Sequence, residues 1–318
     1  MARRRRDRAS RRIVPLLVAV FVVLGVAYVL VEQGPRAAQT SPPAPRVEGT
    51  LRVHYVDVGQ GDGTIWELPD GSLVVYDCGP PASDPGDNPI VRYLRDALDR
   101  PAGSRLLALV ASHGHLDHIG GCEEIFEEYV VEHVYEAWYE GEDAPASYVR
   151  FQEEVLAENA TLHRVPELQP GATLALPARA TLLWPRTFAA GGWDAIAEAS
   201  LVVRLEHGAT SFCFQGDIET RQENELSARC DAYLVGHHGS RTASSAAWLA
   251  RMRPSIAIVS YGDNSYGHPH PEALCRVEQA GAALYATADS DIIVESDGAS
   301  LRVLQGERVA PGACDAPG

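Results

Sequence analysis

The chain has 318 residues, of which 46% are hydrophobic, and its formal net charge at pH 7 is −16. This length can bury the core of one large domain or of two small ones. The acidic balance argues against broad, nonspecific binding of nucleic acid, because that affinity comes mainly from neutralising phosphates. It leaves room for a local basic or metal-binding cleft.

The N-terminus is basic, unlike the rest of the chain. Residues 1–36 contain eight arginines and two acids, a local charge of +6 that leaves −22 for the remainder. Residues 13–31 are 19 positions without a charge, enough to cross a bilayer as a helix. Because arginines favour the cytoplasmic side, we expect a cytoplasmic segment at residues 1–12 and one helix in the cytoplasmic (inner) membrane. The domain that follows is then extracytoplasmic.

A cleaved signal peptide is the competing interpretation of residues 13–31. The apolar core of a signal peptide is usually shorter and ends at a pattern of small residues, and we find no good cleavage pattern here. We therefore favour an uncleaved anchor. Residues 32–48, rich in proline, are then a flexible linker. Residues 49–306 are expected to form one folded domain, with a C-terminal tail at 307–318.

The six cysteines agree with an extracytoplasmic domain, since disulfides persist in oxidising compartments. Six cysteines allow 15 pairings, and the sequence does not choose among them. A zinc site made of cysteines is not indicated, because the sequence contains no C-x-x-C motif.

The first half of the folded domain begins with strands. Residues 51–58 and 64–69 flank the glycine-rich segment "GQGDG" and predict a hairpin. A third strand is expected at 72–79. A helix at 88–99 has Asn88 as its cap and proline at its first position. The apolar run at 105–112 is typical of a strand buried on both faces.

The remaining elements continue this alternation. Further helices are expected at 122–130, 147–160, 219–229, 244–252 and 271–281. Further strands are expected at 172–177, 180–185, 200–206, 211–217, 232–236 and 255–261, followed by three closing strands. A mixed sheet with helices outside implies a layered α/β sandwich.

The segment "SHGHLDHIGG" (112–121) holds three of the chain's 11 histidines and an aspartate within six positions. His113 and His115 lie two residues apart, so just beyond a strand their side chains can point the same way. Asp117 and His118 follow after a further bend and can address a second point. Imidazoles and a carboxylate suit zinc or a similar divalent ion, and the glycines let the loop bend tightly.

Three later positions offer more ligands at the ends of predicted strands. Asp217, in "FQGDIE", could bridge two ions. His237 and His238, in "LVGHHGS", end another buried strand. A carboxylate after a strand is more often a helix cap, but together with the histidine loop a metal role is favoured.

These segments, with "YVDVGQGDGTI", "VVYDCG" and "YGHPHPE", resemble the metallo-β-lactamase superfamily over residues 50–305. Within it, the chain is similar to the soluble domain of ComEC-type DNA-uptake competence proteins and their stand-alone relatives. The resemblance implies a four-layer αββα sandwich, here preceded by one transmembrane helix. The metal site is expected at one edge of the two sheets.

The resemblance also implies roles for individual residues. Asp77 matches the buried acid that orients the ligand loop. The implied metal ligands are His113, His115, Asp117, His118, Asp217 and His237, with His238 as the alternative to His237. One or two divalent ions are expected, Zn²⁺ first and Mn²⁺ as the alternative.

One departure from the superfamily pattern concerns a further metal-binding histidine. It usually precedes the bridging aspartate by 15–20 residues, whereas here Glu198 or Ser200 stands near that place. We expect Ser200 to support the site instead. His207 is closer in sequence but is expected at the exposed end of a strand. One of the two ions is therefore expected to bind more weakly.

Three other segments contain candidates for the site. In "GQGDG", a plain hairpin turn and a role for Asp57 or Asp62 at the site are about equally supported, and the resemblance favours the site. His268 and His270 could line the cleft and act on phosphate or on the leaving group. Ser240, Arg241 and Thr242 could bind an anion at a helix N-terminus. The isolated histidines are expected to serve packing or to lie on the surface: His54, His133 and His163.

Three functions remain open. The first is a membrane-anchored hydrolase of phosphodiesters, nuclease-like and related to DNA uptake. It would use a metal-activated hydroxide that Asp117 orients or deprotonates, and its substrate is DNA or a smaller phosphodiester. The second is a hydrolase of esters or lactones with the same fold, and β-lactams are the least favoured substrate. The third is a non-catalytic metal-binding module. The sequence identifies no protein partner.

Overall fold

The computed structural model describes residues 43–84, 86–137, 139, 144–164, 167–185 and 193–315. The expected cytoplasmic segment 1–12, the expected membrane helix 13–31 and residues 32–42 of the expected linker lie outside these ranges. Within them, no helix has both the length and the apolar character that a membrane span needs.

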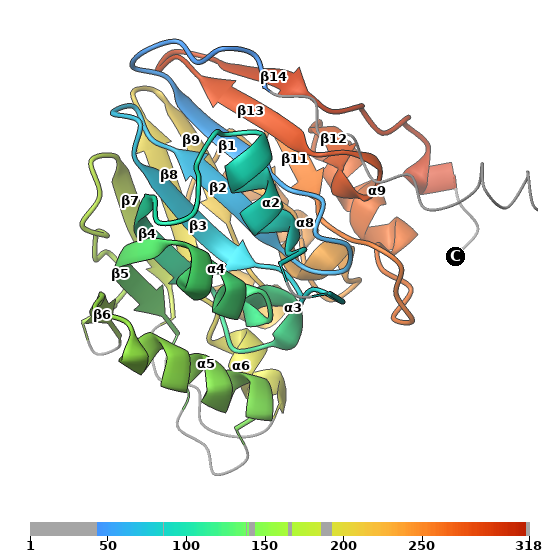
Figure 1. The fold of residues 1–318 in the computed structure, drawn as a ribbon. Helices are drawn as coiled ribbons and strands as arrows, with labels where there is room; N and C mark the ends of the chain where they lie inside the picture. Colours follow the sequence, from blue (N-terminus) through green and yellow to red (C-terminus); the bar gives the residue numbers. More distant parts are fainter. Residues whose placement is uncertain are drawn as a thin grey trace, which may run out of the picture. The chain divides into compact units, whose positions relative to one another are not determined.

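Fourteen strands form two sheets in the described part of the chain (Figure 1). The eight-stranded sheet has the order β14-β13-β1-β2-β3-β4-β5-β6 and the six-stranded sheet the order β12-β11-β10-β9-β8-β7. The strands of the first sheet are β1 (Leu51–Tyr55), β2 (Gly63–Glu67), β3 (Leu73–Cys78), β4 (Arg105–Ala111), β5 (Val130–Glu136), β6 (Thr161–His163), β13 (Ile292–Ser296) and β14 (Leu301–Gln305). Those of the second are β7 (Arg179–Trp184), β8 (Val202–His207), β9 (Thr210–Phe214), β10 (Ala232–Leu234), β11 (Ile256–Val259) and β12 (Ala283–Ala286).

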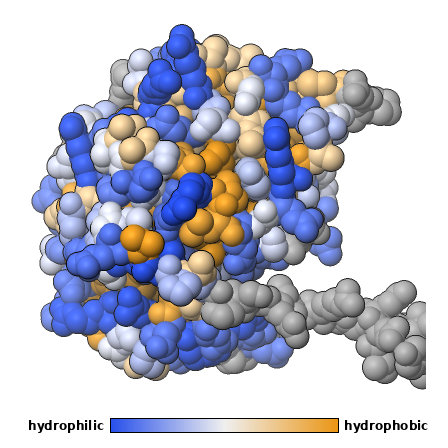
Figure 2. Space-filling model, turned by 90° about the horizontal axis from the view of Figure 1, so that it is seen from above, coloured by the Kyte–Doolittle hydropathy of each residue, from blue (hydrophilic) through white to orange (hydrophobic). Residues whose placement is uncertain are grey.

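Helices cover the outer face of each sheet, which confirms the predicted αββα sandwich. Beside the eight-stranded sheet lie α2 (Pro89–Asp96), α3 (Leu116–Ile119), α4 (Cys122–Glu128), α5 (Ala146–Ala157) and α6 (Trp193–Glu198). Beside the six-stranded sheet lie α7 (Thr220–Glu223), α8 (Ala246–Met252) and α9 (Pro271–Gln279). Figure 2 shows one face of the molecule, where hydrophilic residues surround a central hydrophobic patch. The hydrophilic surround agrees with the charged, acidic composition.

The alternation of side chains along the strands builds three apolar layers. In β3, Val74 and Tyr76 point into the core between the sheets, whereas Val75 points toward the helices. In β9, Phe214 lies in the same central core and Cys213 faces the helices of the other side. Each sheet is therefore buried on both faces, and polar groups that need access to solvent gather at its ends.

Most of the predicted elements are confirmed, and local signals account for them. The hairpin of β1 and β2 is antiparallel, and β4 runs parallel between β3 and β5. Helix α2 begins at Pro89, and the side chain of Asn88 accepts hydrogen bonds from the backbone N–H groups of Ile90 and Val91. Three closing strands are present as predicted: β12, β13 and β14.

Two element predictions were wrong. Residues 172–177 form no regular strand, because successive turns allow only an isolated bridge from Thr173 to Thr181. The helix predicted over 219–229 ends at Glu223. The buried Glu223 carboxylate accepts hydrogen bonds from the backbone N–H groups of Ser244 and Ser245, which fastens the chain to the loop before α8.

The C-terminal residues 308–314 contact the domain. The backbone N–H of Val309 donates to the carbonyl of Leu284, and a disulfide joins Cys314 to Cys275 of α9. Two further disulfides, Cys78–Cys122 and Cys213–Cys230, complete one of the 15 possible pairings.

The direction of the strands determines where loop residues can meet. Strands β3, β4, β5 and β6 are parallel, and so are β9, β10, β11 and β12. Ligand sites in such sheets form beyond the carboxyl ends of the strands. Most of the predicted site residues follow or end one of these strands, whereas Asp62 precedes β2 and Ser200 precedes β8.

Candidate metal centre

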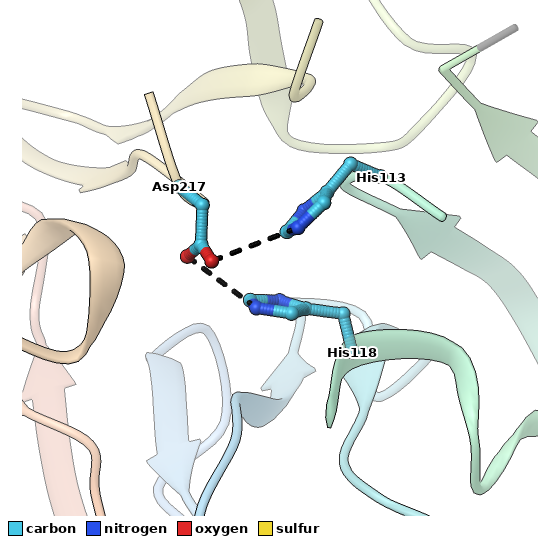
Figure 3. A group of neighbouring side chains, drawn as sticks. All are labelled: His113, His118 and Asp217. Carbon is cyan, nitrogen blue, oxygen red and sulfur yellow. Dashed lines mark ion pairs between the residues drawn. The ribbon is translucent and has the colours of Figure 1, made fainter. Parts of the chain in front are cut away.

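Five side chains from both sheets converge beyond the carboxyl ends of the strands. We call them the His–Asp cluster: His113, Asp117, His118, Asp217 and His238. Figure 3 shows three of them, with His113 and His118 both pointing at the carboxylate of Asp217. His113, His118, Asp217 and His238 are at most 2% exposed, whereas Asp117 reaches the surface. Polar side chains buried this deeply need a partner of some kind.

The loop that carries the histidines bends directly after β4. His115 is the N-terminal cap residue of the short helix α3, which turns Asp117 and His118 back toward His113. Two glycines close the bend. A Cβ at Gly121 would overlap the carbonyl oxygen of Cys78 and the amide of Asn88, so the loop can approach β3 only with glycine there.

Asp77 holds this loop from the end of β3. One carboxylate oxygen accepts hydrogen bonds from the backbone N–H of Ser112, at 2.7 Å. The other lies 2.7 Å from the Ser112 hydroxyl and 2.9 Å from Nδ1 of His118. This contact leaves Nε2 of His118 for the cluster. Asp77 has a φ of 56°, a strained value for a residue other than glycine, and such strain is often found at functional sites.

Ser112 is a member of the site that the sequence analysis missed. Its hydroxyl lies 3.0 Å from Nδ1 of His113 and 3.4 Å from Nδ1 of His118, in addition to its contact with Asp77. One hydroxyl thus orients two imidazoles at once. Its position between a buried strand and the first histidine was the only signal for this role.

The carboxylate of Asp217 lies between two groups of imidazoles. Its Oδ2 faces Nε2 of His113 at 3.6 Å, and its Oδ1 faces Nε2 of His118 at 3.4 Å. The same Oδ1 lies 3.7 Å from Nε2 of His238. Ser200 supports this position, because its hydroxyl accepts a hydrogen bond of 3.1 Å from the Asp217 backbone N–H. The geometry therefore suits a carboxylate that bridges two ions.

The two successive histidines after β10 differ in position. His238 is buried, and its Nε2 lies 3.2 Å from Nε2 of His118 and 3.4 Å from Asp117. The side chain of His237 is 29% exposed, with Nε2 3.7 Å from Oδ2 of Asp217 and Nδ1 3.4 Å from Glu219. Both residues have positive φ, 50° and 51°, which turns their rings in different directions. The geometry favours His238 over His237 as a ligand.

Asp62 comes from "GQGDG" and lies at the cluster, buried beside Nδ1 of His238 at 3.4 Å. Its backbone N–H donates to the carbonyl of Asp117, so this loop packs on the ligand loop. Asp57, the other acid considered there, accepts a hydrogen bond from the backbone of Gly59 within its own loop. Of the two acids, Asp62 is the one that contacts the cluster.

The described donors fit a divalent ion. Three groups of ligand atoms lie within 4.8 Å of one another: His113 with His118 and Asp217, Asp117 with His118 and His238, and Asp62 with Asp77 and His118. A tetrahedral zinc ion that holds two nitrogens at about 2.1 Å separates them by about 3.4 Å. His113 and His115 nitrogens face each other at 3.0 Å. Among the described atoms, no donor forms a hydrogen bond to the buried Oδ1 of Asp217, and a bound cation would be a partner for this oxygen.

The protonation of the cluster follows from burial and charge. Burial favours a neutral His118, but the carboxylates of Asp217, Asp77 and Asp117 raise its pKa well above the usual value. Burial opposes ionisation of Asp217, yet the imidazoles of His237, His118 and His238 hold its pKa well below the usual value. Burial lowers the pKa of His113, with His118 adding to the effect. The carboxylates thus favour positive charge at His118, as a cation site requires, whereas His113 is neutral.

The remaining predicted residues lie in two loops beside the cluster. His268 has its ring 5.3 Å from that of His237, and burial with its neighbouring imidazoles lowers its pKa to about 4. His268 is therefore neutral at pH 7. His270 is the cap residue of α9, and its Nδ1 contacts the carbonyl of Gly267 at 2.7 Å.

The sequence predicted Ser240, Arg241 and Thr242 at a helix N-terminus. The structure instead has them in the loop before α8. Helix α8 begins at Ala246 because the side chain of Ser245 caps it by accepting from the N–H of Trp248. The Ser240 and Thr242 hydroxyls contact each other at 2.8 Å. Arg241 is exposed on the same loop. An anion site at a helix N-terminus is therefore not formed by these three residues.

A disulfide closes the base of the ligand loop. Cys78 follows Asp77 directly, Cys122 follows Gly121 directly, and the two are bonded. Both cysteines are fully buried. Asn88 reinforces the closure with its amide, which lies 3.5 Å from the Cys78 carbonyl and 3.4 Å from that of Gly121. The segment with all four metal-site residues of this loop is thus covalently tied to the strand of Asp77.

Comparisons with known proteins agree with this architecture. Residues 57–191 match the family model of the metallo-beta-lactamase superfamily. ComE operon protein 3 of Bacillus subtilis is 35% identical over 82 residues, which cover 24% of this chain and 11% of that protein. Recombination protein 2 of Haemophilus influenzae is 26% identical over 265 residues, 76% of this chain and 28% of that protein. Competence protein ComA of Neisseria gonorrhoeae is 34% identical over 95 residues, 28% of this chain and 14% of that protein.

Each match thus covers less than a third of the relative's own length. The family match contains the ligand loop and ends before Asp217 and His238. By the family match, the layered fold and these relatives, residues 57–191 resemble the metallo-β-lactamase superfamily, and the chain is similar to competence proteins such as ComA.

Proposed function

We propose that the chain is a metal-dependent hydrolase of phosphodiesters. The observation that carries this proposal is the position of Asp217, whose two carboxylate oxygens face different imidazoles, His113 on one side and His118 with His238 on the other. A carboxylate between two donor groups suits a pair of ions, and paired ions are typical of enzymes that displace groups at phosphorus. The match of residues 57–191 to a superfamily named for hydrolases supports the same reaction class.

The donor groups differ in how complete they are. The group around Oδ1 of Asp217 contains His118, His238 and Asp117, and the one around Oδ2 contains His113 with His115 beside it. We infer that the first group binds its ion more tightly. The second group lacks the additional histidine of the superfamily pattern and has His237 as its remaining candidate, at 3.7 Å from Oδ2. Zn²⁺ is the expected ion and Mn²⁺ the alternative.

A divalent ion bound here supplies a Lewis acid that makes water nucleophilic near neutral pH. Asp117 is the cluster carboxylate that reaches the surface, with its side chain 31% exposed. Burial opposes its ionisation, but His118 and His238 lower its pKa below the usual value, so it remains a carboxylate. We infer that Asp117 orients the attacking water and accepts its proton. In the hydrolysis one P–O bond forms to that water oxygen, one breaks, and the leaving oxygen takes up a proton.

The location of the enzyme belongs to the same proposal. We infer that residues 13–31 anchor it in the cytoplasmic membrane, with residues 1–12 inside and the domain from residue 49 outside. The arginine cluster before the apolar run and three disulfides in the domain support this orientation. The substrate is then DNA or a smaller phosphodiester outside the membrane, and a link to DNA uptake is supported by the competence relatives.

The test is hydrolysis of bis(p-nitrophenyl) phosphate by the full chain with and without added Zn²⁺ or Mn²⁺. We expect metal-dependent turnover that is lost in Asp217→Asn and retained in Asp231→Asn. Asp231 is the matched control, because its carboxylate accepts from the Ser211 backbone at the other end of the strands. Turnover on p-nitrophenyl acetate alone would mean an ester hydrolase. Bound metal without any turnover would mean a binding module, and either outcome would overturn the proposal.

A further inference from the structure

The loop between β11 and α9 presents a row of aromatic rings beside the His–Asp cluster. The ring of His268 lies 6.5 Å from that of His238, which belongs to the cluster. The ring of Tyr266 lies 5.8 Å from His268 on its other side, at an interplanar angle of 33°. Tyr266 is therefore separated from the cluster by a single ring.

Tyr266 is exposed in a way that other aromatic residues here are not. Tyr266 is 69% exposed, and no other Phe, Tyr or Trp in the described part of the chain is largely exposed. Large aromatic residues are otherwise used in the core, as Trp66, Tyr76 and Phe214 are. A flat ligand that covers this ring would remove its apolar surface from water, which favours binding.

The loop holds Tyr266 in place without help from a ligand. Oδ1 of Asn264 accepts hydrogen bonds from the backbone N–H groups of Tyr266, Gly267 and His268, at 3.0, 3.0 and 3.1 Å. Its Nδ2 donates to the carbonyl of His268 at 2.8 Å. The backbone N–H of His270 donates to the carbonyl of Gly239, which fastens this loop to the turn that carries His238. Because the backbone of the loop is fixed in this way, little backbone entropy is lost when Tyr266 binds a flat partner.

We propose that Tyr266 forms a stacking subsite for an unpaired nucleobase next to the phosphodiester that the cluster binds. This inference rests on the proposed function and narrows its substrate class to single-stranded nucleic acid or a nucleotide. Aromatic side chains stack on every base, so the subsite recognises a base without choosing its identity. Bases inside a duplex already stack on one another and are not presented to a single ring.

Because the molecule is acidic, base stacking must supply a larger share of the binding affinity. An acidic domain attracts a polyanion poorly, so electrostatic contacts along the strand supply little affinity. Arg241 lies exposed on the turn that follows His238, and no ion pair to it is found within the described residues, which leaves its guanidinium for one phosphate. A short substrate held by one base and one or two phosphates fits this distribution of charge.

The test is equilibrium binding of fluorescein-labelled oligothymidylate of twelve residues to the full chain, measured by fluorescence anisotropy in EDTA, where hydrolysis is suppressed. The matched probe is an oligonucleotide of equal length and charge in which every base is replaced by an abasic tetrahydrofuran unit. We expect Tyr266→Ala to weaken binding of oligothymidylate about 5- to 150-fold, the effect of removing one stacking aromatic. Tyr266→Phe keeps the ring and is expected to bind within about twofold of the wild type.

Binding of the abasic probe separates stacking from a structural defect. We expect Tyr266→Ala and the wild type to bind it equally, whereas an equal loss for both probes would overturn the inference. The inference also fails if the wild type does not prefer oligothymidylate or if Tyr266→Ala leaves its binding unchanged. Base-dependent binding by a chain that hydrolyses no phosphodiester would preserve the subsite and contradict the proposed function. Turnover of bis(p-nitrophenyl) phosphate without base-dependent binding would support the proposed function and contradict the stacking subsite.

Discussion

Nδ1 of His118 lies 2.9 Å from Oδ2 of Asp77, and both side chains are fully buried. Burial raises the pKa of Asp77, and the neighbouring His118 offsets part of this rise. The contact fixes the ring of His118 so that Nε2 faces Asp217 and His238. Asp77, which contacts His118 from behind, thus determines the orientation of this imidazole in the His–Asp cluster.

Replacing this acid should weaken metal binding while the fold is retained. In Asp77→Asn the amide can still accept from the Ser112 backbone, and asparagine tolerates the positive φ of 56°. Because the negative charge behind His118 is lost, we expect the affinity for Zn²⁺ to fall about 10- to 100-fold. Competition against a chromophoric chelator measures this change. Asp231→Asn is the control, and an equal loss there would refute the role of Asp77.

Removing the disulfide at the base of the ligand loop should lower metal affinity by more than the loss of stability alone would cause. The bonds Cys78–Cys122 and Cys275–Cys314 span 44 and 39 residues. Chain entropy therefore predicts nearly the same stabilisation for each, about 4 kcal/mol. Only the first joins the ligand loop to the strand of Asp77. We expect the double variant C78A/C122A to lose metal affinity about tenfold or more, the scale of a lost supporting contact.

The double variant C275A/C314A serves as the matched control, with an expected metal affinity close to that of the wild type. Urea unfolding of both variants in the presence of a chelator gives the free energy of unfolding without metal. If both variants lose the same metal affinity, the disulfide acts on overall stability alone and the positioning role is wrong.

Local patterns in the sequence predict most of the fold, and long-range contacts account for the rest. Helix α2 is readable because its cap and its first-turn proline are adjacent in the chain. Strand β5 was not predicted, because polar residues interrupt its apolar run. Its last residue, Glu136, is buried and forms an ion pair with Arg164, 28 positions later. A pairing of that kind leaves no local trace in the sequence.

The same distinction applies to the site. His113, His115, Asp117 and His118 are recognisable because they lie within six consecutive positions, and Asp217 because it comes at the end of a predicted strand. The choice between His237 and His238 depends on two consecutive backbone conformations with positive φ. The residue types at these positions do not predict such conformations. The role of Ser112 depends on Asp77, 35 positions earlier.

The stability of the domain should change with pH through Asp291, outside the His–Asp cluster. Burial raises its pKa to about 6, although a hydrogen bond from the Asp57 backbone partly opposes this. Because the folded-state pKa lies above the unfolded value of about 3.9, its contribution is fully present below pH 3.9 and is lost as pH rises through about 6. Asp291→Asn keeps the acceptor and removes the charge. We expect it to be up to about 3 kcal/mol more stable than the wild type at pH 8, and less so at pH 5.

Urea unfolding at the two pH values measures this difference. The exposed Asp297, whose carboxylate accepts from the backbone of Ala299 and Ser300, provides the contrasting variant. Asp297→Asn should not become more stable at pH 8, since these hydrogen bonds lower the pKa of Asp297. A gain for Asp291→Asn that is the same at pH 5 and pH 8 would contradict the assignment of the effect to ionisation of Asp291.

The two histidines after β10 should differ in their effect on the metal centre. Nε2 of His238 lies within 3.2–3.7 Å of His118, Asp117 and Asp217, whereas Nε2 of His237 approaches only Asp217, at 3.7 Å, among the cluster members. We therefore expect His238→Ala to remove the more tightly bound ion, so that metal content measured by mass spectrometry falls by about one equivalent. His237→Ala should retain that ion and weaken the second one. The opposite order of effects would make His237 the principal ligand, and equal losses would mean that the turn is needed only as a whole.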